Sequence, residues 1–271
     1  LDNKYNTSNF KVAVGHDLMG NFINSYLFKE NSQFQAYVCL SPDFYGSLNN
    51  HIAQRLAYSE KEIFYYLATA EKDIPIIREN ILSADALLKE VTNANITYYF
   101  DDFKGENHYT LVSGAIARSF DKIFELYNPI REKELNEKVL TYEGTLDNYL
   151  LDRYSRIDEL FGITKPINEK ELIKVANVAE QREDYKSLEK LGKLAKKLYP
   201  ENLLGTYYIA QSAEKMCKTK KAKKLYESAL VLNDAANIDK DYITSKIEEL
   251  SVVLVDTDVE ELEELEEEDN E

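Results

Sequence analysis

The sequence predicts an α/β fold: a partial parallel sheet of about four strands with flanking helices, followed by an all-α stack of helix pairs. Strand and helix patterns alternate four times before Pro129, and only helical patterns follow it. Residues of similar kind also recur 34 positions apart in the second part. The expected segments are a sheet domain at 1–130, a helical connector at 131–165, helical repeats at 166–254 and a disordered acidic tail at 255–271.

Four short apolar runs predict the strands. They lie at 10–15, 36–41, 63–68 and 96–100, and the helical patterns lie at 18–29, 49–59, 73–91 and 109–127. Strands that alternate with helices are typical of a parallel sheet with right-handed crossovers. Because the carboxyl ends of such strands share one edge, we expect a site there, in the loops around Asp17, Ser41, Glu71 and His108.

The composition is that of a globular protein, with 44% hydrophobic residues among 271. No apolar run reaches the ~18 residues that a membrane-spanning helix needs, so no membrane span is predicted. The net charge of −16 is concentrated at the end, because residues 256–271 carry 11 carboxylates and no Lys or Arg. Cys39 and Cys217 lie far apart in the sequence, so it predicts neither a disulfide framework nor a metal site, and no cofactor.

A dense run of lysines precedes the acidic tail. It comprises Lys215, Lys218, Lys220, Lys221, Lys223 and Lys224. Such a run usually forms a solvated helix face, and without aromatic residues between the lysines it predicts no nucleic-acid binding. The tail could fold back on these lysines as a salt-sensitive cover that a partner releases, or could serve only to keep the protein soluble.

Four pairs of residues carry the 34-residue spacing. They are Val175 with Ile209, Ala176 with Ala210, Leu188 with Ala222 and Ala195 with Ala229. The pattern resembles the tetratricopeptide repeat, in which small residues let the two helices of a unit approach closely. Two units at about 172–205 and 206–239, with a closing helix near 240–254, would form a short stack that binds a protein or peptide segment, although other helical hairpin arrays could give a few such pairs.

The segment Gly15–Gly20, with the sequence Gly-His-Asp-Leu-Met-Gly, lies between a predicted strand and a predicted helix. A small residue before such a turn lets the chain bend sharply, so that residue 17 projects above the edge of the sheet. This is the setting of the nucleophile elbow of α/β-hydrolases, where the projecting residue is a serine. Here it is Asp17, and the glycine usually found two residues later is Met19.

From Val12 to about Ile130 the chain resembles the C-terminal half of a family of esterase-like α/β-hydrolases that includes the siderophore (enterobactin-type) esterases. Four segments carry the resemblance. They begin at Gly15 (Gly-His-Asp-Leu-Met-Gly-Asn-Phe), Phe34 (Phe-Gln-Ala-Tyr-Val-Cys-Leu-Ser-Pro-Asp), Phe64 (Phe-Tyr-Tyr-Leu-Ala-Thr-Ala-Glu-Lys-Asp) and Gly105 (Gly-Glu-Asn-His-Tyr-Thr-Leu). The resemblance covers a little under half of the chain and implies an ester-type small-molecule substrate.

The family implies a triad in the order nucleophile, acid, histidine. Asp17 stands in the place of the nucleophile, and His108 stands in the place of the general base. The acid belongs in the turn after the third strand, where Asp73 is favoured slightly over Glu71. The backbone N–H of Leu18 would be one oxyanion donor.

Because Asp17 has no hydroxyl, the usual serine route of acyl transfer lacks its nucleophile. The first interpretation is an esterase-like fold that is catalytically degenerate, with the helical repeats as a binding module. In the alternative, Asp17 is itself the nucleophile, as in the families of epoxide hydrolases and haloalkane dehalogenases that it also resembles, or the site is that of a repurposed ester hydrolase. His16 is expected to pack inside the elbow, and His51 to lie on a helix surface.

The resemblance suggests export to the periplasm, but no signal-peptide pattern precedes Phe10, and the compartment stays open. Esterases of this kind have several strands ahead of the elbow, and a loop among them supplies the second oxyanion donor. Only nine residues precede Phe10 here. Either an N-terminal half precedes Leu1 or a half-sheet of four strands stands alone. We expect the first, because that half would also cover the open edge of the first strand.

Overall fold

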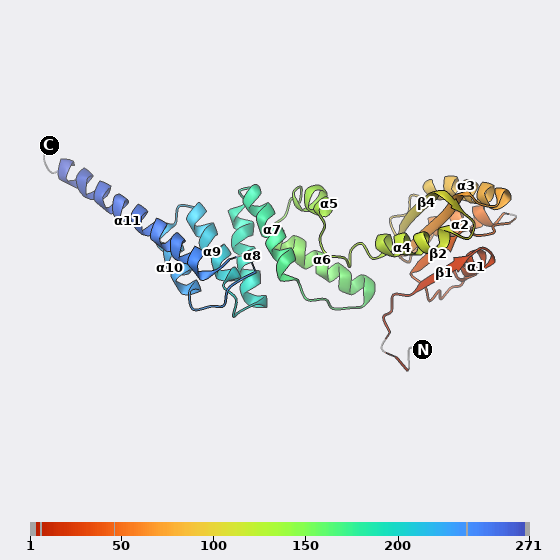
Figure 1. The fold of residues 1–271 in the computed structure, drawn as a ribbon, viewed down its shortest axis with the longest axis horizontal. Helices are drawn as coiled ribbons and strands as arrows, with labels where there is room; N and C mark the ends of the chain where they lie inside the picture. Colours follow the sequence, from red (N-terminus) through yellow and green to blue (C-terminus); the bar gives the residue numbers. More distant parts are fainter. Residues whose placement is uncertain (1–3, 6, 46, 237, 269–271) are drawn as a thin grey trace. The chain divides into compact units, whose positions relative to one another are not determined.

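The structure is a computed structural model that describes residues 4, 5, 7–45, 47–236 and 238–268, with side chains described as far as residue 254. The chain divides into two compact units, and each is described by itself. Unit 1 comprises Leu1–Asn128 with Glu159–Ile163, and unit 2 comprises Pro129–Asp158 with Thr164–Glu271. In the described part of the chain, every strand of the sheet lies in unit 1 (Figure 1).

Unit 1 is built on a parallel sheet with the strand order β1-β2-β3-β4. The strands are β1 (Val12–His16), β2 (Ala36–Leu40), β3 (Ile63–Lys72) and β4 (Ile96–Asn107). The helices are α1 (Leu18–Phe22), the 3-10 turn η1 (Ile23–Tyr26), α2 (Leu48–Ala57), α3 (Pro75–Lys89) and α4 (Leu111–Ile123). The predicted four-stranded parallel sheet with flanking helices is therefore confirmed.

The two central strands are buried on both faces, which is typical of parallel sheets. Tyr37 and Tyr65 pack on one face, in a core shared with α2 and α3. Val38 and Tyr66 pack on the other face, in a core shared with α4. Because helices cover both faces, the edge at the carboxyl ends of the strands remains as the place for a site.

Three elements of unit 1 differ in length from the prediction. The helix predicted at 18–29 is one α-helical turn followed by η1. Glycine and asparagine are weak helix formers, and the side-chain amide of Asn24 donates to the carbonyl of Gly20 at 2.8 Å. Strands β3 and β4 continue past the predicted ends at 68 and 100, into polar residues that the apolar pattern does not mark.

Unit 2 is helical in its described residues. Its elements are α5 (Glu132–Glu134), the π-helical turn η2 (Leu135–Val139), α6 (Leu146–Phe161, whose last turn belongs to unit 1), α7 (Glu169–Gln181), α8 (Tyr185–Leu198), α9 (Leu204–Lys215), α10 (Thr219–Ala229) and α11 (Lys240–Glu268). From α7 onward, each helix packs against the next.

The last helix, α11, continues into the segment predicted as a disordered acidic tail. The side chains from residue 255 on lie outside the described residues, and so does the predicted contact of the tail with the lysine run. Throughout the described chain, the helices are too short or too polar to cross a membrane.

Two glycines allow helices α8 and α9 to approach closely. A Cβ added at Gly205 would lie 2.4 Å from the backbone N of Lys196 and 2.7 Å from the carbonyl O of Gly192. A helical Gly→Ala change normally stabilises by about 1 kcal/mol. At Gly205 the added methyl group would collide with backbone atoms of α8, so the substitution is expected to destabilise the protein instead.

We expect Gly205→Ala to lower the free energy of unfolding by about 1–3 kcal/mol, the usual cost of overpacking. Urea unfolding measures the change. The same substitution at Gly114 in α4 is the control, because its Cβ would meet only the ring of Phe103, at 3.3 Å. A stabilised Gly205→Ala protein would contradict the close packing of α8 on α9.

Candidate functional site

Asp17 occupies a sharp turn between β1 and α1. Its backbone has φ 56° and ψ −126°, a conformation that costs a non-glycine residue energy and persists only when surrounding contacts hold it. The Asp17 N–H donates to the carbonyl of Leu40 at 3.1 Å, and its carbonyl accepts from the N–H groups of Asn21 and Asp43 at 3.1 and 3.3 Å. These bonds tie the turn to the end of β2, so the strained residue has a fixed position.

Glycines on both sides of Asp17 make the turn possible. A Cβ at Gly15 would lie 2.3 Å from the carbonyl O of Met19, inside the backbone of α1. A Cβ at Gly20 would lie 3.0 Å from the carbonyl O of Gly15 and 3.1 Å from the Cβ of Pro42. The helix therefore starts directly against the strand, with Asp17 at its N-terminal end.

His108 follows the last residue of β4, and its side chain is 4% exposed. Its Nδ1 lies 2.8 Å from Oδ1 of Asp73 and 2.9 Å from Oγ of Ser41. Oδ1 of Asp73 also accepts from the N–H of Ile74 at 2.8 Å. Oδ2 accepts from Oγ1 of Thr69 at 2.8 Å and from Oγ of Ser41. Four donors therefore surround one buried carboxylate.

These hydrogen bonds set the charge of Asp73. Burial by itself would raise the pKa of the Asp73 carboxyl, but the hydrogen bonds from Ser41, His108, Thr69 and the Ile74 N–H outweigh it and lower that pKa below its usual value. An ionised carboxylate only accepts, so this network assigns the proton of neutral His108 to Nδ1. The lone pair of Nε2 is then free to take a proton.

The Nε2 atom of His108 points toward the turn. It lies 3.9 Å from Oδ2 of Asp17, and it is a buried atom without a hydrogen-bond partner among the described residues. The Asp17 side chain is 41% exposed, so it lies between the buried imidazole and solvent. His16 donates from Nε2 to the carbonyl O of His108 at 2.8 Å, and the two rings lie 4.6 Å apart. The loop that carries the imidazole is therefore held against β1.

The structure brings three of the predicted site residues together and leaves one out. Asp17, His108 and Asp73 form a continuous series, with the imidazole between the two carboxylates. Glu71 lies elsewhere and accepts from the N–H of Gly105 at 2.8 Å. Leu18 is the first residue of α1, where backbone N–H groups have no acceptor within the helix.

Sequence reasoning did not identify Ser41 and Thr69 as site residues. Ser41 is fully buried with φ 42°, directly after β2, and Thr69 is fully buried in β3. The position of Ser41 at a strand end was visible in the sequence, but its role as a donor to Asp73 depends on the pairing of β2 with β3. Thr69 stands four residues before Asp73, a spacing that carries no signal in a strand.

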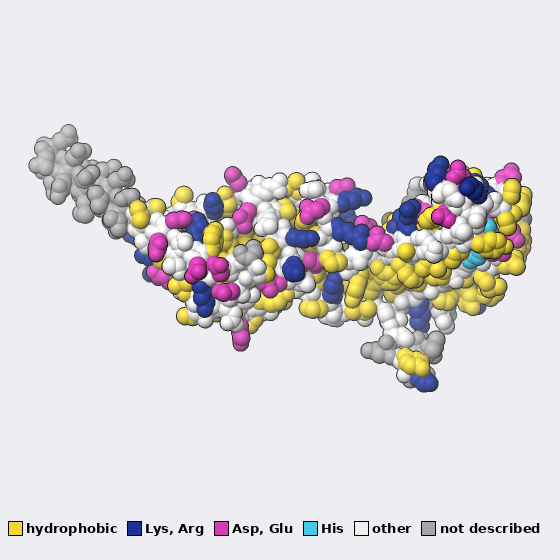
Figure 2. Space-filling view, in the orientation of Figure 1, with side chains coloured by type: hydrophobic (Ala, Val, Ile, Leu, Met, Phe, Trp, Pro, Cys, Tyr) yellow, Lys and Arg dark blue, Asp and Glu magenta, His cyan; other side chains and the backbone are white. Residues whose placement is uncertain are grey.

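An apolar surface starts next to the turn. Leu18, Met19 and Phe22 are each more than half exposed. Together with Phe28 and Leu48 they line a hollow of about 500 Å³. Figure 2 shows hydrophobic side chains gathered on this part of unit 1. A substrate with an apolar group could place that group here while its reacting atom lies at Asp17.

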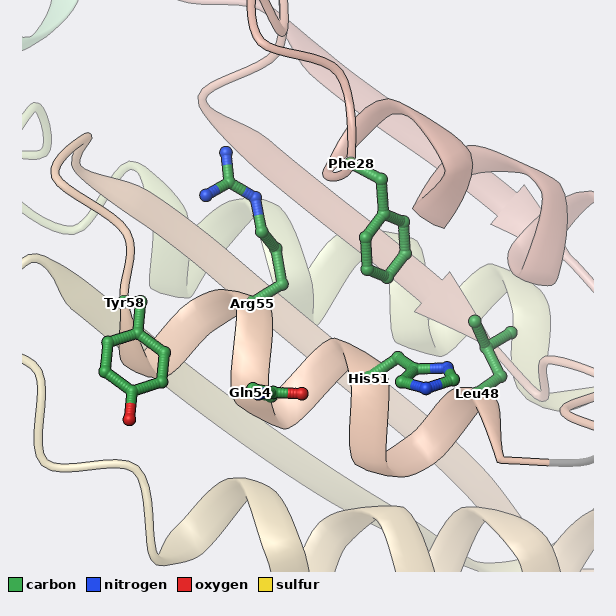
Figure 3. Close-up of a pocket in the computed structure, with 6 residues that line it drawn as sticks. All are labelled: Phe28, Leu48, His51, Gln54, Arg55 and Tyr58. Atoms are coloured by element: carbon green, nitrogen blue, oxygen red, sulfur yellow. The ribbon is translucent and has the colours of Figure 1, made fainter.

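A second hollow of about 530 Å³ continues the first, because both include Phe28 and Leu48. Figure 3 shows Phe28 facing a row of side chains from α2 and the residue after it, including His51 and Arg55. Nε of Arg55 donates to the carbonyl of Leu27 at 2.7 Å. His51 is exposed, in agreement with the prediction that it lies on a helix surface.

Comparisons with known proteins give the fold but no family. No family model matches the chain, and no curated protein matches it. An uncharacterised protein from Capnocytophaga ochracea is similar in structure, with a TM-score of 0.76 and 24% identity over 93% of this chain and 71% of that chain. An IroE-like serine hydrolase from Shewanella oneidensis has a TM-score of 0.51 and 14% identity over 73% of this chain.

The matched region is 62% of the serine hydrolase, so this chain spans less than two thirds of that protein. A BES protein from Bacillus cereus has 21% identity over 40% of this chain and 44% of that chain, but its TM-score of 0.35 is too low to support an argument. Because the identities are below 25%, the likeness concerns the fold alone. The chain has an α/β fold similar to that of the IroE-like serine hydrolase.

Proposed function

We propose that unit 1 is a hydrolase in which the carboxylate of Asp17 replaces the usual serine as the nucleophile. The observation that carries this proposal is the Nε2 atom of His108, which has no hydrogen-bond partner in the described part of the chain. Asp73 lies behind the imidazole and Asp17 in front of it. A buried polar atom without a partner is costly. A proton-transfer role for Nε2 explains why it is kept free.

The substrate that suits a carboxylate nucleophile has an electrophilic sp³ carbon, as an epoxide or an alkyl halide does. In the first step, an Asp17 oxygen bonds to that carbon, and the leaving oxygen or halide departs with the bonding electron pair. An epoxide oxygen released in this way takes a proton from solvent, and a halide leaves as the anion. The product is an alkyl ester of Asp17. The apolar surface at Leu18 and Phe22 would hold the rest of the substrate.

In the second step, His108 accepts a proton from water at Nε2 while the water oxygen adds to the carbonyl carbon of the Asp17 ester. The Asp73 carboxylate stabilises the imidazolium that forms, as the buried aspartate does in a serine triad. The Leu18 N–H at the start of α1 donates to the developing oxyanion. Collapse of this intermediate expels the alcohol, which takes the proton from His108. The Asp17 carboxylic acid that remains releases its proton to solvent, which restores the carboxylate.

Interruption of the second step tests the proposal. In His108→Gln the base is absent, so we expect an aryl epoxide such as styrene oxide to alkylate Asp17 and the ester to accumulate. Mass spectrometry of the peptide that contains Asp17 measures the added mass. The native protein should turn over without accumulating the adduct.

Two matched variants complete this test. Asp17→Asn combined with His108→Gln should give no adduct, and His51→Gln should behave like the native protein because His51 lies outside the triad. Absence of any adduct on Asp17 in His108→Gln, with the fold intact, would refute the carboxylate nucleophile.

A second candidate function is a catalytically degenerate hydrolase fold whose helical region binds a protein segment. The supporting observation is in unit 2, where seven of the eight residues that share the 34-residue spacing are fully buried. These are Val175, Ala176, Ala210, Leu188, Ala222, Ala195 and Ala229. Their burial fits tetratricopeptide-like units at about 172–205 and 206–239, preceded by a connector at about 131–165. Lack of turnover together with peptide binding by unit 2 would favour this candidate.

A further inference from the structure

Unit 2 contains a polar cavity that the hydrolase site does not use. Its volume is about 270 Å³, and its lining comes from three helices and the loop before α11. The lining residues are Asn177 and Glu180 on α7, Tyr207 and Tyr208 on α9, Ile238, and Tyr242 on α11. A carboxylate and three phenol rings therefore surround one small space.

The aromatic rings of the cavity are packed against one another. The centroid of Tyr207 lies 5.3 Å from that of Tyr208 and 6.0 Å from that of Tyr242. Burial raises the pKa of both Tyr207 and Tyr208, so their hydroxyls stay neutral at physiological pH. Neutral phenols offer an electron-rich ring face and an oxygen acceptor, and both attract a cation.

Within the described residues, one group in the cavity lacks a hydrogen-bond partner and another lacks a cationic partner. Tyr208 is 1% exposed, and its hydroxyl has no hydrogen-bond partner among the described residues. Glu180 is half-buried, and within the described part of the chain no Lys or Arg nitrogen lies within 4.0 Å of its carboxylate. Buried hydroxyls and carboxylates are normally satisfied, so these two indicate a ligand that supplies donors and positive charge.

The pKa of the Glu180 carboxyl is also consistent with a cationic ligand. Burial raises the pKa of the Glu180 carboxyl, and a hydrogen bond from the Gln211 side chain and the charge of Lys215 offset only part of the effect. The Lys215 side chain itself is exposed. A cation seated in the cavity would complete the stabilisation of this carboxylate.

We infer that this cavity binds a primary alkylammonium group, as a lysine side chain of a partner polypeptide presents it. An ammonium group carries three donors, which match the Glu180 carboxylate, the Tyr208 hydroxyl and the amide oxygen of Asn177. A quaternary ammonium group has no donor and would leave these acceptors unpaired. Ile238 gives an apolar contact for the methylene stem, and the cavity opens to solvent at Asn177 and Tyr242.

The test uses the full chain with isotope-labelled tyrosines and follows ring signals by NMR. The probes are acetyl-Gly-Lys-Gly-amide, the same peptide with Nε-acetyl-lysine, and 1,5-diaminopentane. The lysine peptide should shift the signals of Tyr207, Tyr208 and Tyr242 in a saturable way, and the acetylated peptide should not. Stronger binding of the peptide than of the diamine identifies a polypeptide ligand, whereas stronger binding of the diamine identifies a small amine and overturns the polypeptide assignment.

Two variants and one control locate the contacts. Glu180→Gln should weaken binding of the lysine peptide at least about tenfold, the order expected when a hydrogen bond to a charged group is lost. Tyr208→Phe should also weaken it, and we expect this variant to keep the fold because the hydroxyl has no hydrogen-bond partner among the residues that the structure describes. Glu227→Gln removes the same charge from α10 and should bind like the native protein.

Three further outcomes would overturn the inference: equal binding of the charged and acetylated peptides, no saturable shift, or equal effects of Glu180→Gln and Glu227→Gln. None of them bears on the site at Asp17, which lies in unit 1 and is assayed with different substrates. A failure here and a failure of the proposed hydrolase are therefore separate results.

Discussion

Asp17→Ser is expected to give the protein an esterase activity toward p-nitrophenyl acetate that the native chain lacks. The change restores a hydroxyl at the strained turn, facing the Nε2 atom that already lies 3.9 Å from the Asp17 carboxylate. A serine nucleophile supplies on the order of 10⁶ in turnover, and a misplacement of ~1 Å costs about 10²-fold. We therefore expect a gain of about 10²–10⁴-fold over Asp17→Ala, measured as release of p-nitrophenol.

Epoxide hydrolysis should show the reverse order. The native protein is expected to be active and Asp17→Ala inactive, because only the carboxylate can form the ester intermediate. The pair Asp17→Ser and Asp17→Ala differs by one oxygen atom, so differences in folding are small. If Asp17→Ser folds and remains inert toward esters, the imidazole and the turn do not form a working pair, and the degenerate interpretation gains support.

The sequence predicted the sheet well because its apolar runs are short and separated by helical patterns. Strands Ala36–Leu40 and Ile63–Lys72 are buried on both faces, so nearly every residue there contributes to the apolar signal. The parallel order of β1 to β4 follows from alternation with helices, which leaves few other topologies. The α/β fold could therefore be predicted from the pattern of apolar and helical segments alone.

The ends of β3 and β4 could not be predicted in the same way. Both strands continue into polar residues, and in β4 two of these, Asp101 and Asp102, pair with side chains from helices α3 and α4. Arg78 of α3 donates to both carboxylate oxygens of Asp102, at 2.8 and 2.7 Å, and Lys122 of α4 donates to Asp101 at 3.0 Å. Such contacts exist only after the helices pack, so a local pattern cannot contain them.

The same distinction between local pattern and packing applies to the candidate site. The sequence indicated Asp17, His108 and Asp73 because each follows a strand and matches a family position. It named Ser41 only as a position at the expected edge of the sheet and did not indicate Thr69. Ser41 reaches Asp73 because β2 pairs with β3, and Thr69 reaches it from within β3. Local motifs thus predict Asp17, His108 and Asp73, whereas the contact of Ser41 with Asp73 depends on the assembled sheet.

Asp73→Asn is expected to reduce turnover of the native reaction by about 10⁴-fold, the loss seen when the aspartate of a serine triad becomes asparagine. An amide next to Nδ1 can stabilise the wrong tautomer of His108, which places the proton on Nε2 and removes the base. The fold should survive, because an amide oxygen can still accept from Ser41 and Thr69. Steady-state turnover of the epoxide, with circular dichroism for the fold, measures both effects.

The same substitution should change how stability depends on pH. The pKa of Asp73 is lower in the folded protein than in the unfolded chain, so its ionised form stabilises the fold above the unfolded pKa, and this contribution is lost as the pH falls through the acidic range. Asp73→Asn should flatten that acid dependence. Asp102→Asn is the matched control: Arg78 lowers the pKa of Asp102, so this variant should also flatten the acid dependence of stability, but it should keep its turnover. If both variants kept full turnover, His108 would not be acting as the base, and the carboxylate at Asp73 would serve the fold alone.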